Sequence, residues 1–471
     1  MSFNPTSRAW ALCAAAAHAS CFGQPLAESA PDAAFTVLTQ DKQAVVRVLT
    51  QALVCPGIEW DDQPARPMNV RAAAAGVPER SGSAQKKGKP ALFSVLSCEA
   101  TWPAGVQRAR VAGRELPAPH SEIRRIVIVA DTGCRMKASE KAFQACNDSQ
   151  AWPFARIAQS AAAKKPDLVL HIGDIHYRES PCPSGDAGCA ESPWGYGYDV
   201  WQADFFAPAR PLLAAAPWVF VRGNHESCFR AGQGWFRFID AQPWSQARSC
   251  DDPANDADAD YSPPYAVALN AQTQLIVFDS SKTNGQAFST QDLSFRKYTQ
   301  ELAAVAQMAQ QKATSFFMSH HPLLAVASVK DPKKFKAAGN EGLQSVFSAL
   351  YPERLFPQGV SLALHGHVHL FEAISFKGVQ PASLVLGNSG SANEGRAPMS
   401  LPIGAQLYPG AEVEDYAARS EFGFATMDRV PGGAAGDWLL TEYDVEGVPV
   451  LECALSGGKS HCGKVGSTSR D

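Results

Sequence analysis

The chain has 471 residues and an ordinary globular composition, with 45% hydrophobic and 19% charged residues. Its formal net charge of -4 provides no general attraction for nucleic acid or for an anionic membrane surface. The only dense basic cluster, Lys86 to Lys89, lies in a Gly/Ser-containing stretch and is interpreted as a solvated loop. The length allows one large domain with a packed core and a smaller second domain.

The N-terminus has the layout of a secretory signal peptide. Arg8 precedes an Ala/Leu/Trp-rich segment, and small residues follow at Ala17, Ala19 and Ser20. We therefore expect residues 1–23 to be a signal peptide and the mature protein to be exported, either periplasmic or secreted. A frayed Ala-rich helix is the alternative. A lipid anchor at Cys21 is disfavoured because His18 stands three residues before it, where Leu is usual. No later apolar run approaches the ~18 residues of a transmembrane helix.

The cysteines agree with export, because an even number of them, ten, remains outside the candidate signal peptide. Pairing of close neighbours is the simplest hypothesis and leaves two cysteines for a fifth bridge. The pairs are Cys134 with Cys146, Cys182 with Cys189, Cys228 with Cys250, Cys453 with Cys462, and the remaining Cys55 with Cys98. A zinc ribbon is disfavoured because the sequence contains no Cys-x-x-Cys pair.

The pattern of apolar runs changes along the chain. Residues 30–118 contain β-like runs at 44–55, 91–102 and 108–116, which predict a small N-terminal β domain. From Ile123 onward, apolar strands alternate with Ala-rich helical segments at 152–164 and 302–311, as in an α/β domain. Five further apolar runs after Leu370 are typical of strands that complete the same sheets. We therefore expect a second domain over residues 119–471.

Five of the apolar runs end at side chains that can bind metal ions. These runs are IVIVAD at Asp131, LVLHIGD at Asp174, WVFVRGN at Asn224, SFFMSH at His320, and LALHGHVH at His367 and His369. Ligands of open α/β sheets collect at the carboxyl ends of the strands, so these side chains are predicted to converge. Each of these side chains also has a possible structural role, such as a helix cap for Asp131. Tyr177, three residues after Asp174, is either a further metal ligand or an aromatic ring that packs over the turn. Eight of the eleven histidines lie in or beside these strand ends, however, which favours a two-metal hydrolytic site.

The ordered motifs DTG, GDIHY, GNHE, FMSH and GHVH resemble those of the metallophosphoesterase (calcineurin-like phosphoesterase) superfamily. The Tyr177-containing second motif is similar to that of its purple acid phosphatase branch. The resemblance covers residues 123–430 and implies an α/β fold in which a β-sandwich is flanked by helices, an α/β/β/α four-layer arrangement. It also implies a phosphatase that hydrolyses small phosphomonoesters by in-line attack of a metal-bound hydroxide.

The same resemblance assigns the metal ligands. A ferric ion would be held by Asp131, Asp174, Tyr177 and His369, and a divalent ion by Asp174, Asn224, His320 and His367. The donor chemistry agrees, because three anionic oxygens with one imidazole favour Fe(III), whereas the second set favours Zn, Mn or Fe in the divalent state. Gly133 stands where most members of the superfamily have a metal-binding His, and this fits Tyr177 taking that coordination position.

His225 is the expected catalytic residue, since it follows a ligand directly and would remain uncoordinated to protonate the leaving alkoxide. His321 and His176 are weaker candidates. The sequence departs from the family after His320, where further histidines are usual and this chain has AVASVKDP. Lys330 is an alternative source of phosphate-binding charge, although an ordinary surface lysine fits equally.

Two questions stay open at the level of sequence. The loop that follows Tyr177 carries Trp194, Tyr196 and Tyr198, and it is either a specificity lip over the metals or a packed loop. The reaction is either phosphomonoester hydrolysis or, on the same fold, phosphodiester or nucleotide hydrolysis, and a metal-retaining envelope protein without enzymatic activity is the third possibility.

Overall fold

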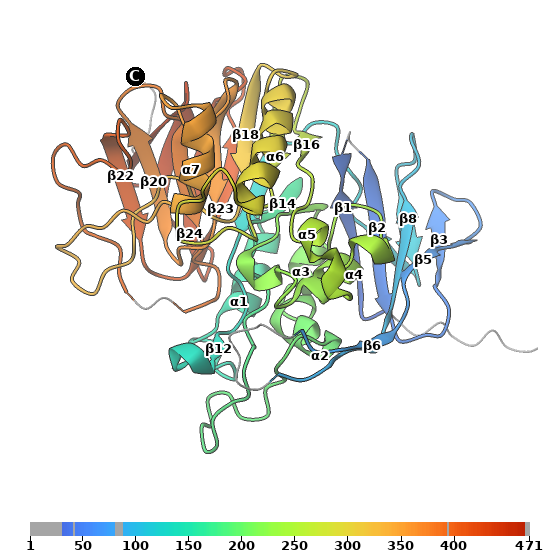
Figure 1. The fold of residues 1–471 in the computed structure, drawn as a ribbon. Helices are drawn as coiled ribbons and strands as arrows, with labels where there is room; N and C mark the ends of the chain where they lie inside the picture. Colours follow the sequence, from blue (N-terminus) through green and yellow to red (C-terminus); the bar gives the residue numbers. More distant parts are fainter. Residues whose placement is uncertain (1–30, 41–42, 81–87, 393–394, 467–471) are drawn as a thin grey trace, which may run out of the picture.

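The computed structural model describes residues 31–40, 43–80, 88–392 and 395–466. Within these residues, two large β-sheets stack face to face and helices cover their outer faces (Figure 1). This confirms the predicted α/β sandwich with four layers. The predicted signal peptide and Cys21 lie outside the described residues.

The first sheet has eleven strands and mixes parallel and antiparallel pairs. In spatial order they are β26 (Lys459–Gly463), β25 (Pro449–Ser456), β24 (Trp438–Asp444), β23 (Gly423–Arg429), β11 (Arg125–Val129), β14 (Leu168–His171), β15 (Trp218–Phe220), β1 (Ala33–Leu38), β2 (Ala44–Thr50), β8 (Leu96–Thr101) and β5 (Asn69–Ala72). The parallel neighbours β11, β14 and β15 form its centre.

The second sheet has seven strands. Their order is β16 (Tyr265–Ala268), β17 (Thr273–Val277), β18 (Thr314–Met318), β19 (Val360–His365), β21 (Ala382–Leu386), β20 (Phe371–Phe376) and β22 (Val413–Arg419). The five apolar runs predicted after Leu370 are β20, β21, β23, β24 and β25, so the C-terminal strands complete both sheets, as expected.

The core between the sheets follows from the alternation of side chains along each strand. On β11, Ile126 and Ile128 face the second sheet, whereas Val127 and Val129 face the helices. On β18, Phe316 and Met318 face inward, and Phe317 packs on the outer helices. Strands that are buried on both faces have continuous apolar sequences, and this is why they could be predicted from the sequence.

The helices form two separate outer layers (Figure 1). Those on the first sheet are α1 (Phe154–Ala162), α2 (Tyr198–Trp201), α3 (Arg210–Leu213), α4 (Gly232–Phe238) and α5 (Asp256–Ala259). The second sheet is covered by α6 (Leu293–Ala309) and α7 (Glu341–Leu350). The segment predicted over 302–311 thus begins earlier, at Leu293, because the first half of α6 lacks alanine and is held by buried contacts such as that of Tyr298.

The N-terminal strands join the large sheet. β1 pairs in parallel with β15 at Val37 and Trp218, and β2, β8 and β5 continue the sheet outward. Shorter strands lie in the same region: β3 (Gly57–Trp60), β4 (Arg66–Pro67), β9 (Ala109–Val111) and β10 (Arg114–Leu116) form one small sheet, and β6 (Ala75–Val77) and β7 (Ala91–Phe93) form another. The division of the chain into domains of residues 30–118 and 119–471 stays a prediction.

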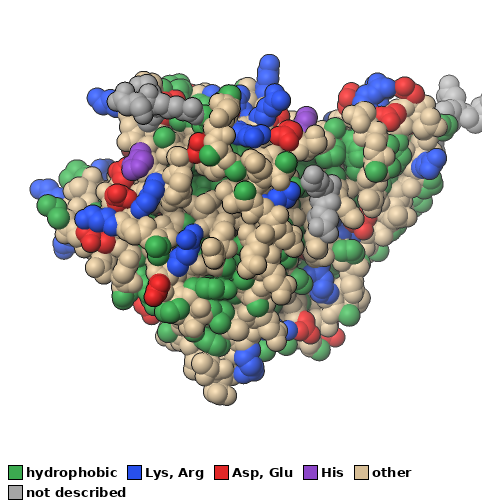
Figure 2. Space-filling view, turned by 90° about the horizontal axis from the view of Figure 1, so that it is seen from above, with side chains coloured by type: hydrophobic (Ala, Val, Ile, Leu, Met, Phe, Trp, Pro, Cys, Tyr) green, Lys and Arg blue, Asp and Glu red, His purple; other side chains and the backbone are tan. Residues whose placement is uncertain are grey.

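All five predicted disulfides are present: Cys55–Cys98, Cys134–Cys146, Cys182–Cys189, Cys228–Cys250 and Cys453–Cys462. Among the described residues, no helix has the length and apolar content that a membrane span requires. On the face shown in Figure 2, basic and acidic side chains are interspersed rather than separated by sign.

Candidate metal centre

Five parallel strands deliver the candidate ligands to one place. β11, β14 and β15 lie side by side in the first sheet and are followed by Asp131, Asp174 and Asn224. β18 and β19 are neighbours in the second sheet and are followed by His320 and His367. Because the carboxyl ends of parallel strands share an edge, the two stacked sheets bring both groups together.

Tyr177 is the centre of an oxygen-rich group. Its Oη lies 2.9 Å from Asp131 Oδ1, 3.0 Å from Asp174 Oδ2 and 2.9 Å from His369 Nε2. His369 Nε2 is also 3.3 Å from Asp131 Oδ1. The four side chains predicted for the harder metal therefore point at a common centre.

An imidazole-rich group adjoins it through Asp174, whose Oδ2 lies 3.1 Å from His320 Nε2. The ring centroids of His320 and His367 are 5.2 Å apart. His321 also adjoins this group, with its ring centroid 4.3 Å from that of His367, and its Nδ1 is 3.1 Å from Ser280 Oγ. Asn224 Oδ1 is buried and accepts no hydrogen bond from the residues that the structure describes. A buried amide oxygen without a donor is costly, and a cation would satisfy it.

Buried acceptors fix the orientation of two candidate ligands. His320 Nδ1 lies 2.8 Å from the Ile172 carbonyl, and His369 Nδ1 lies 2.9 Å from the Ala392 carbonyl. These contacts leave both Nε2 atoms facing the cluster, which is the usual outer-shell arrangement of metal-binding histidines.

Three of the candidate ligands have a strained backbone conformation. Asp131, Asp174 and His367 have φ of 53°, 54° and 70°, in the left-handed region that residues with a side chain rarely adopt. Gly223 allows the second and third ligand loops to approach, because a Cβ there would lie 2.1 Å from Asp174 Oδ1.

Glu226 ties these two loops together and was not assigned a role from the sequence. Its Oε2 accepts the N–H groups of Asp174 and Gly223, each at 3.0 Å. Its Oε1 accepts those of Ile175 at 2.8 Å and His176 at 3.1 Å. The sequence placed Glu226 inside GNHE, but nothing in that motif indicated that it binds the preceding loop.

The electrostatics of the chain itself favour a cation at the cluster. Burial and the carboxylates of Asp131 and Asp174 raise the pKa of Tyr177 well above its usual value. Burial also opposes ionisation of Asp174, but His320 and His225 hold the pKa of Asp174 well below its usual value. Although burial lowers it, the Asp174 carboxylate raises the pKa of His320 to about 9. Protons thus occupy positions that a metal ion would take, and metal binding would release them.

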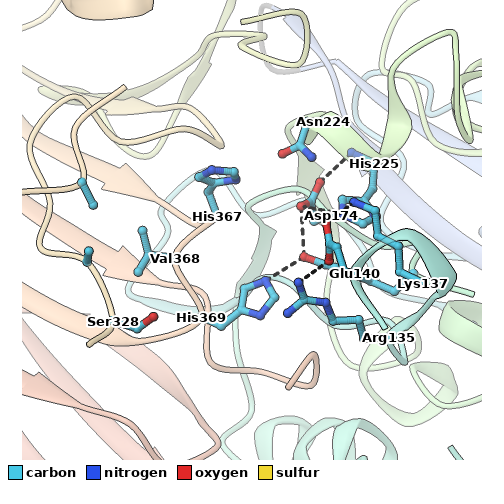
Figure 3. A pocket seen from close by; sticks show the side chains of 13 residues that line it. Arg135, Lys137, Glu140, Asp174, Asn224, His225, Ser328, His367, Val368 and His369 are labelled. Carbon is cyan, nitrogen blue, oxygen red and sulfur yellow. Dashed lines mark hydrogen bonds and ion pairs between the residues drawn. The ribbon is translucent and has the colours of Figure 1, made fainter. Parts of the chain in front are cut away.

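The cluster opens into a cavity of about 360 Å³. Metal-ligand candidates and His225 form part of its lining, together with Arg135, Lys137, Glu140, Ala327, Ser328, Ala338 and Val368. Figure 3 shows Ser328 and Val368 on one side of the histidines and Arg135, Lys137 and Glu140 on the other. The lining does not include His176 or His321.

His225 is held by a buried charge pair. Its Nδ1 lies 2.8 Å from both Glu179 Oε1 and the His176 carbonyl, and Arg230 pairs with the same Glu179. His225 Nε2 lies 3.8 Å from Asp174 Oδ2. Burial and Arg230 lower the pKa of His225, and the carboxylates of Asp174 and Glu179 oppose this shift. Neither Glu179 nor Arg230 had been singled out from the sequence.

The aromatic loop after Tyr177 is a packed loop. Tyr196 is buried against the ring of His176, and Tyr198 donates to Asp32 at 2.9 Å. Neither these two residues nor Trp194 lines the cavity. Part of the cavity wall is formed instead by Arg135, Lys137 and Glu140. They belong to a hairpin that comprises β12 (Met136–Lys137), the short helix η2 (Ala138–Glu140) and β13 (Ala142–Phe143) and is closed by the Cys134–Cys146 disulfide.

The fold and the cluster together define the class of candidate two-metal phosphoester hydrolases. A family model described as calcineurin-like phosphoesterase matches residues 124–371, more than half of the chain. The chain belongs to this family.

Three solved structures are similar to this chain, and the one with a TM-score above 0.5, that of PhoD, agrees with it at the level of fold. The structure of PhoD is 11% identical, covers 95% of this chain and 94% of its own, and has a TM-score of 0.52. A purple acid phosphatase, PPD1 from yellow lupin (Lupinus luteus) seeds, is 14% identical over 88% of this chain and 72% of its own, with a TM-score of 0.48. A dimetal phosphatase from Danio rerio is 12% identical over 73% of this chain and 99% of its own, with a TM-score of 0.36. No curated protein sequence matches the chain.

Proposed function

We propose that this protein is an exported binuclear-metal phosphatase that hydrolyses phosphomonoesters. The observation that carries the proposal is the convergence of the seven candidate ligands beside one cavity that also contains His225. Family membership supports phosphoester hydrolysis, and the composition of the site supports the finer assignment.

The residues fit a pair of unlike metal ions. One group supplies two anionic oxygens and an imidazole, from Asp131, Tyr177 and His369. The other supplies an amide oxygen and two imidazoles, from Asn224, His320 and His367. Asp174 lies between the two groups. Hard oxygen donors favour Fe(III), and the second set favours divalent Zn, Mn or Fe. A metal pair of this kind activates water and stabilises charge on the phosphoryl group.

The chain's own groups handle the leaving group. His225 is buried at the cavity wall and uncoordinated, so a bound phosphate dianion would favour its protonated form and align it to protonate the leaving alkoxide. Glu179 contacts Nδ1 of the ring, whereas Nε2 lies 2.7 Å from Arg230 Nη2 and 3.8 Å from Asp174 Oδ2. His321 and His176 are weaker candidates, because both are buried outside the cavity lining.

Export is supported by the five disulfides, since such bonds persist in oxidising compartments. The N-terminal sequence supports the same conclusion through its signal-peptide layout.

The test is hydrolysis of p-nitrophenyl phosphate and bis-p-nitrophenyl phosphate by purified protein loaded in turn with Fe, Zn and Mn. We expect a higher kcat/KM for the monoester and a large loss of kcat in His225→Ala. A preference for the diester would replace phosphomonoesterase with phosphodiesterase. Inactivity of every metal-loaded form on a broad phosphoester panel would favour a non-enzymatic role.

A further inference from the structure

A lysine-rich segment begins and ends at the wall of the metal cavity. We call residues 329–337 the basic arm. At its base, Val326 forms an antiparallel bridge with Ala337, and the Ala327 N–H donates to the Lys336 carbonyl at 2.8 Å. Ala327, Ser328 and Ala338, which flank the arm in sequence, line the cavity. The arm is therefore attached directly to the site.

A second segment of backbone holds the arm along its length. Val329 and Arg396 exchange two backbone hydrogen bonds, at 2.8 and 2.9 Å, and the Met399 N–H donates to the Pro332 carbonyl at 2.9 Å. These bonds fix the direction in which the arm leaves the cavity wall.

The arm carries an excess of positive charge. It contains four lysines, Lys330, Lys333, Lys334 and Lys336, against one acid, Asp331, in a chain whose net charge is -4. All four lysines are exposed, and none forms an ion pair with the residues that the structure describes. Like charges this close repel one another, so an anion bound among them would be stabilised.

The opposite wall of the cavity differs. There Lys137 Nζ lies 2.6 Å from Glu140 Oε1, and Arg135 pairs with the same carboxylate (Figure 3). The positive charge of that wall is partly neutralised by the protein itself. The lysines of the arm, by contrast, form no such ion pairs with the described residues, and this distinguishes the two sides of the site.

The arm is close enough to reach a ligand that fills the cavity. Ser328 lines the cavity, and the two residues from Ser328 to Lys330 span at most roughly 7 Å. Lys336 lies directly across the hairpin from Ala327, another lining residue. A substrate whose scissile phosphate lies at the metals would therefore extend its alcohol portion toward these two lysines.

We propose that the substrate is a small phosphoester whose alcohol portion carries a second anionic group, a phosphate or a carboxylate, and that the basic arm binds this group. Lys330 and Lys336 are the specificity-determining residues. The inference rests on the proposed function, because it places the scissile phosphate at the metal centre.

The test compares two substrates that differ only by a second phosphate, fructose 1-phosphate and fructose 1,6-bisphosphate. We expect kcat/KM for the bisphosphate to be higher by about tenfold or more at low salt, and the preference to shrink as salt is added. Lys330→Glu combined with Lys336→Glu should reduce the ratio of the two kcat/KM values to about the statistical factor of two for two cleavable phosphates.

The control variant carries Lys165→Glu and Lys312→Glu, an equal change of charge. These lysines precede β14 and β18, at the ends of the strands opposite to the metal ligands, so the ratio should stay as in the wild type. Absence of a preference for the bisphosphate, or a preference that survives in the arm variant, would overturn the inference.

Calorimetric binding of both sugar phosphates to the metal-loaded protein separates the inference from the proposed function. If no phosphoester is hydrolysed, the proposed function fails. Tighter binding of the bisphosphate that depends on the arm would still support the inference, and equal binding of both sugar phosphates would overturn it.

Discussion

Glu226 is a buried carboxylate whose replacement tests how the metal-binding loops are held. It accepts four backbone N–H groups, two on each oxygen, from the loops that carry Asp174 and Asn224. In Glu226→Gln the shape of the side chain is preserved, but one oxygen becomes an NH₂ group that cannot accept a hydrogen bond.

The number of lost bonds does not depend on how the amide is oriented. In one orientation the N–H groups of Asp174 and Gly223 lose their acceptor, and in the other those of Ile175 and His176 do. Each buried N–H without a partner costs about 1–3 kcal/mol, so the free energy of unfolding should fall by about 2–6 kcal/mol. Because Asp174 is held at a φ of 54°, its loop should also relax and bind metal more weakly.

Two measurements check this prediction: denaturant-induced unfolding and the metal content of protein purified in parallel with the wild type. Glu301→Gln is the matched control. Glu301 is also buried, burial raises its pKa well above the usual value, and its Oε2 has no hydrogen-bond partner among the described residues. The control should cost less than about 1 kcal/mol, since burial favours the neutral acid, which glutamine resembles in shape and charge. Equal unfolding midpoints and metal contents for Glu226→Gln and wild type would refute the role given to Glu226.

Three further substitutions probe the site and the sheet beside it. Gly223→Ala should abolish metal binding, because its Cβ would lie 2.1 Å from Asp174 Oδ1. The control Gly76→Ala should bind metal normally, because nothing lies within 4 Å of its Cβ. The metal content of both purified variants tests this prediction. Tyr177→Phe should bleach any visible colour that arises from phenolate-to-Fe(III) charge transfer, and an absorption spectrum unchanged from that of a coloured wild type would contradict the ferric assignment. Burial raises the pKa of Glu372 to about 8, so between about pH 5 and 8 the folded state holds a proton that the unfolded state loses. The free energy of unfolding should therefore fall over this pH range, by up to about 1.4 kcal/mol per pH unit. Unfolding of Glu372→Gln at pH 6 and 8 should lack this contribution, and an unchanged pH dependence would contradict it.

The strands were predictable from the sequence where they are buried on both faces. β11 and β18 read as unbroken apolar runs because one set of their side chains meets the other sheet and the alternate set meets helices. The pairing of β1 with β15 was not predictable, since it joins Val37 to Trp218 and no local pattern marks so distant a contact. The start of α6 at Leu293 was missed for a related reason, because tertiary burial rather than alanine content holds its first turns.

The rim of the cavity shows a different limit. Three aromatic residues in a long loop suggested a lip, yet Tyr196 and Tyr198 are buried. Arg135 and Lys137 line the cavity from a hairpin whose strands have two residues each, which is too short for any periodicity to appear. The sequence therefore identified candidate ligands that the structure brings together, but it did not indicate which other residues line the cavity.

The occurrence of Gly133 together with Tyr177 has a steric basis in the structure. A Cβ at position 133 would lie 2.5 Å from the Ile175 carbonyl oxygen and 2.9 Å from the Tyr177 nitrogen, so the first loop can approach the second only with glycine there. That approach accompanies the contact of the Tyr177 Oη with Asp131 at 2.9 Å. A histidine at position 133 would push the two loops apart and displace the phenol. The oxygen-rich half of the site therefore depends on a glycine that binds nothing itself.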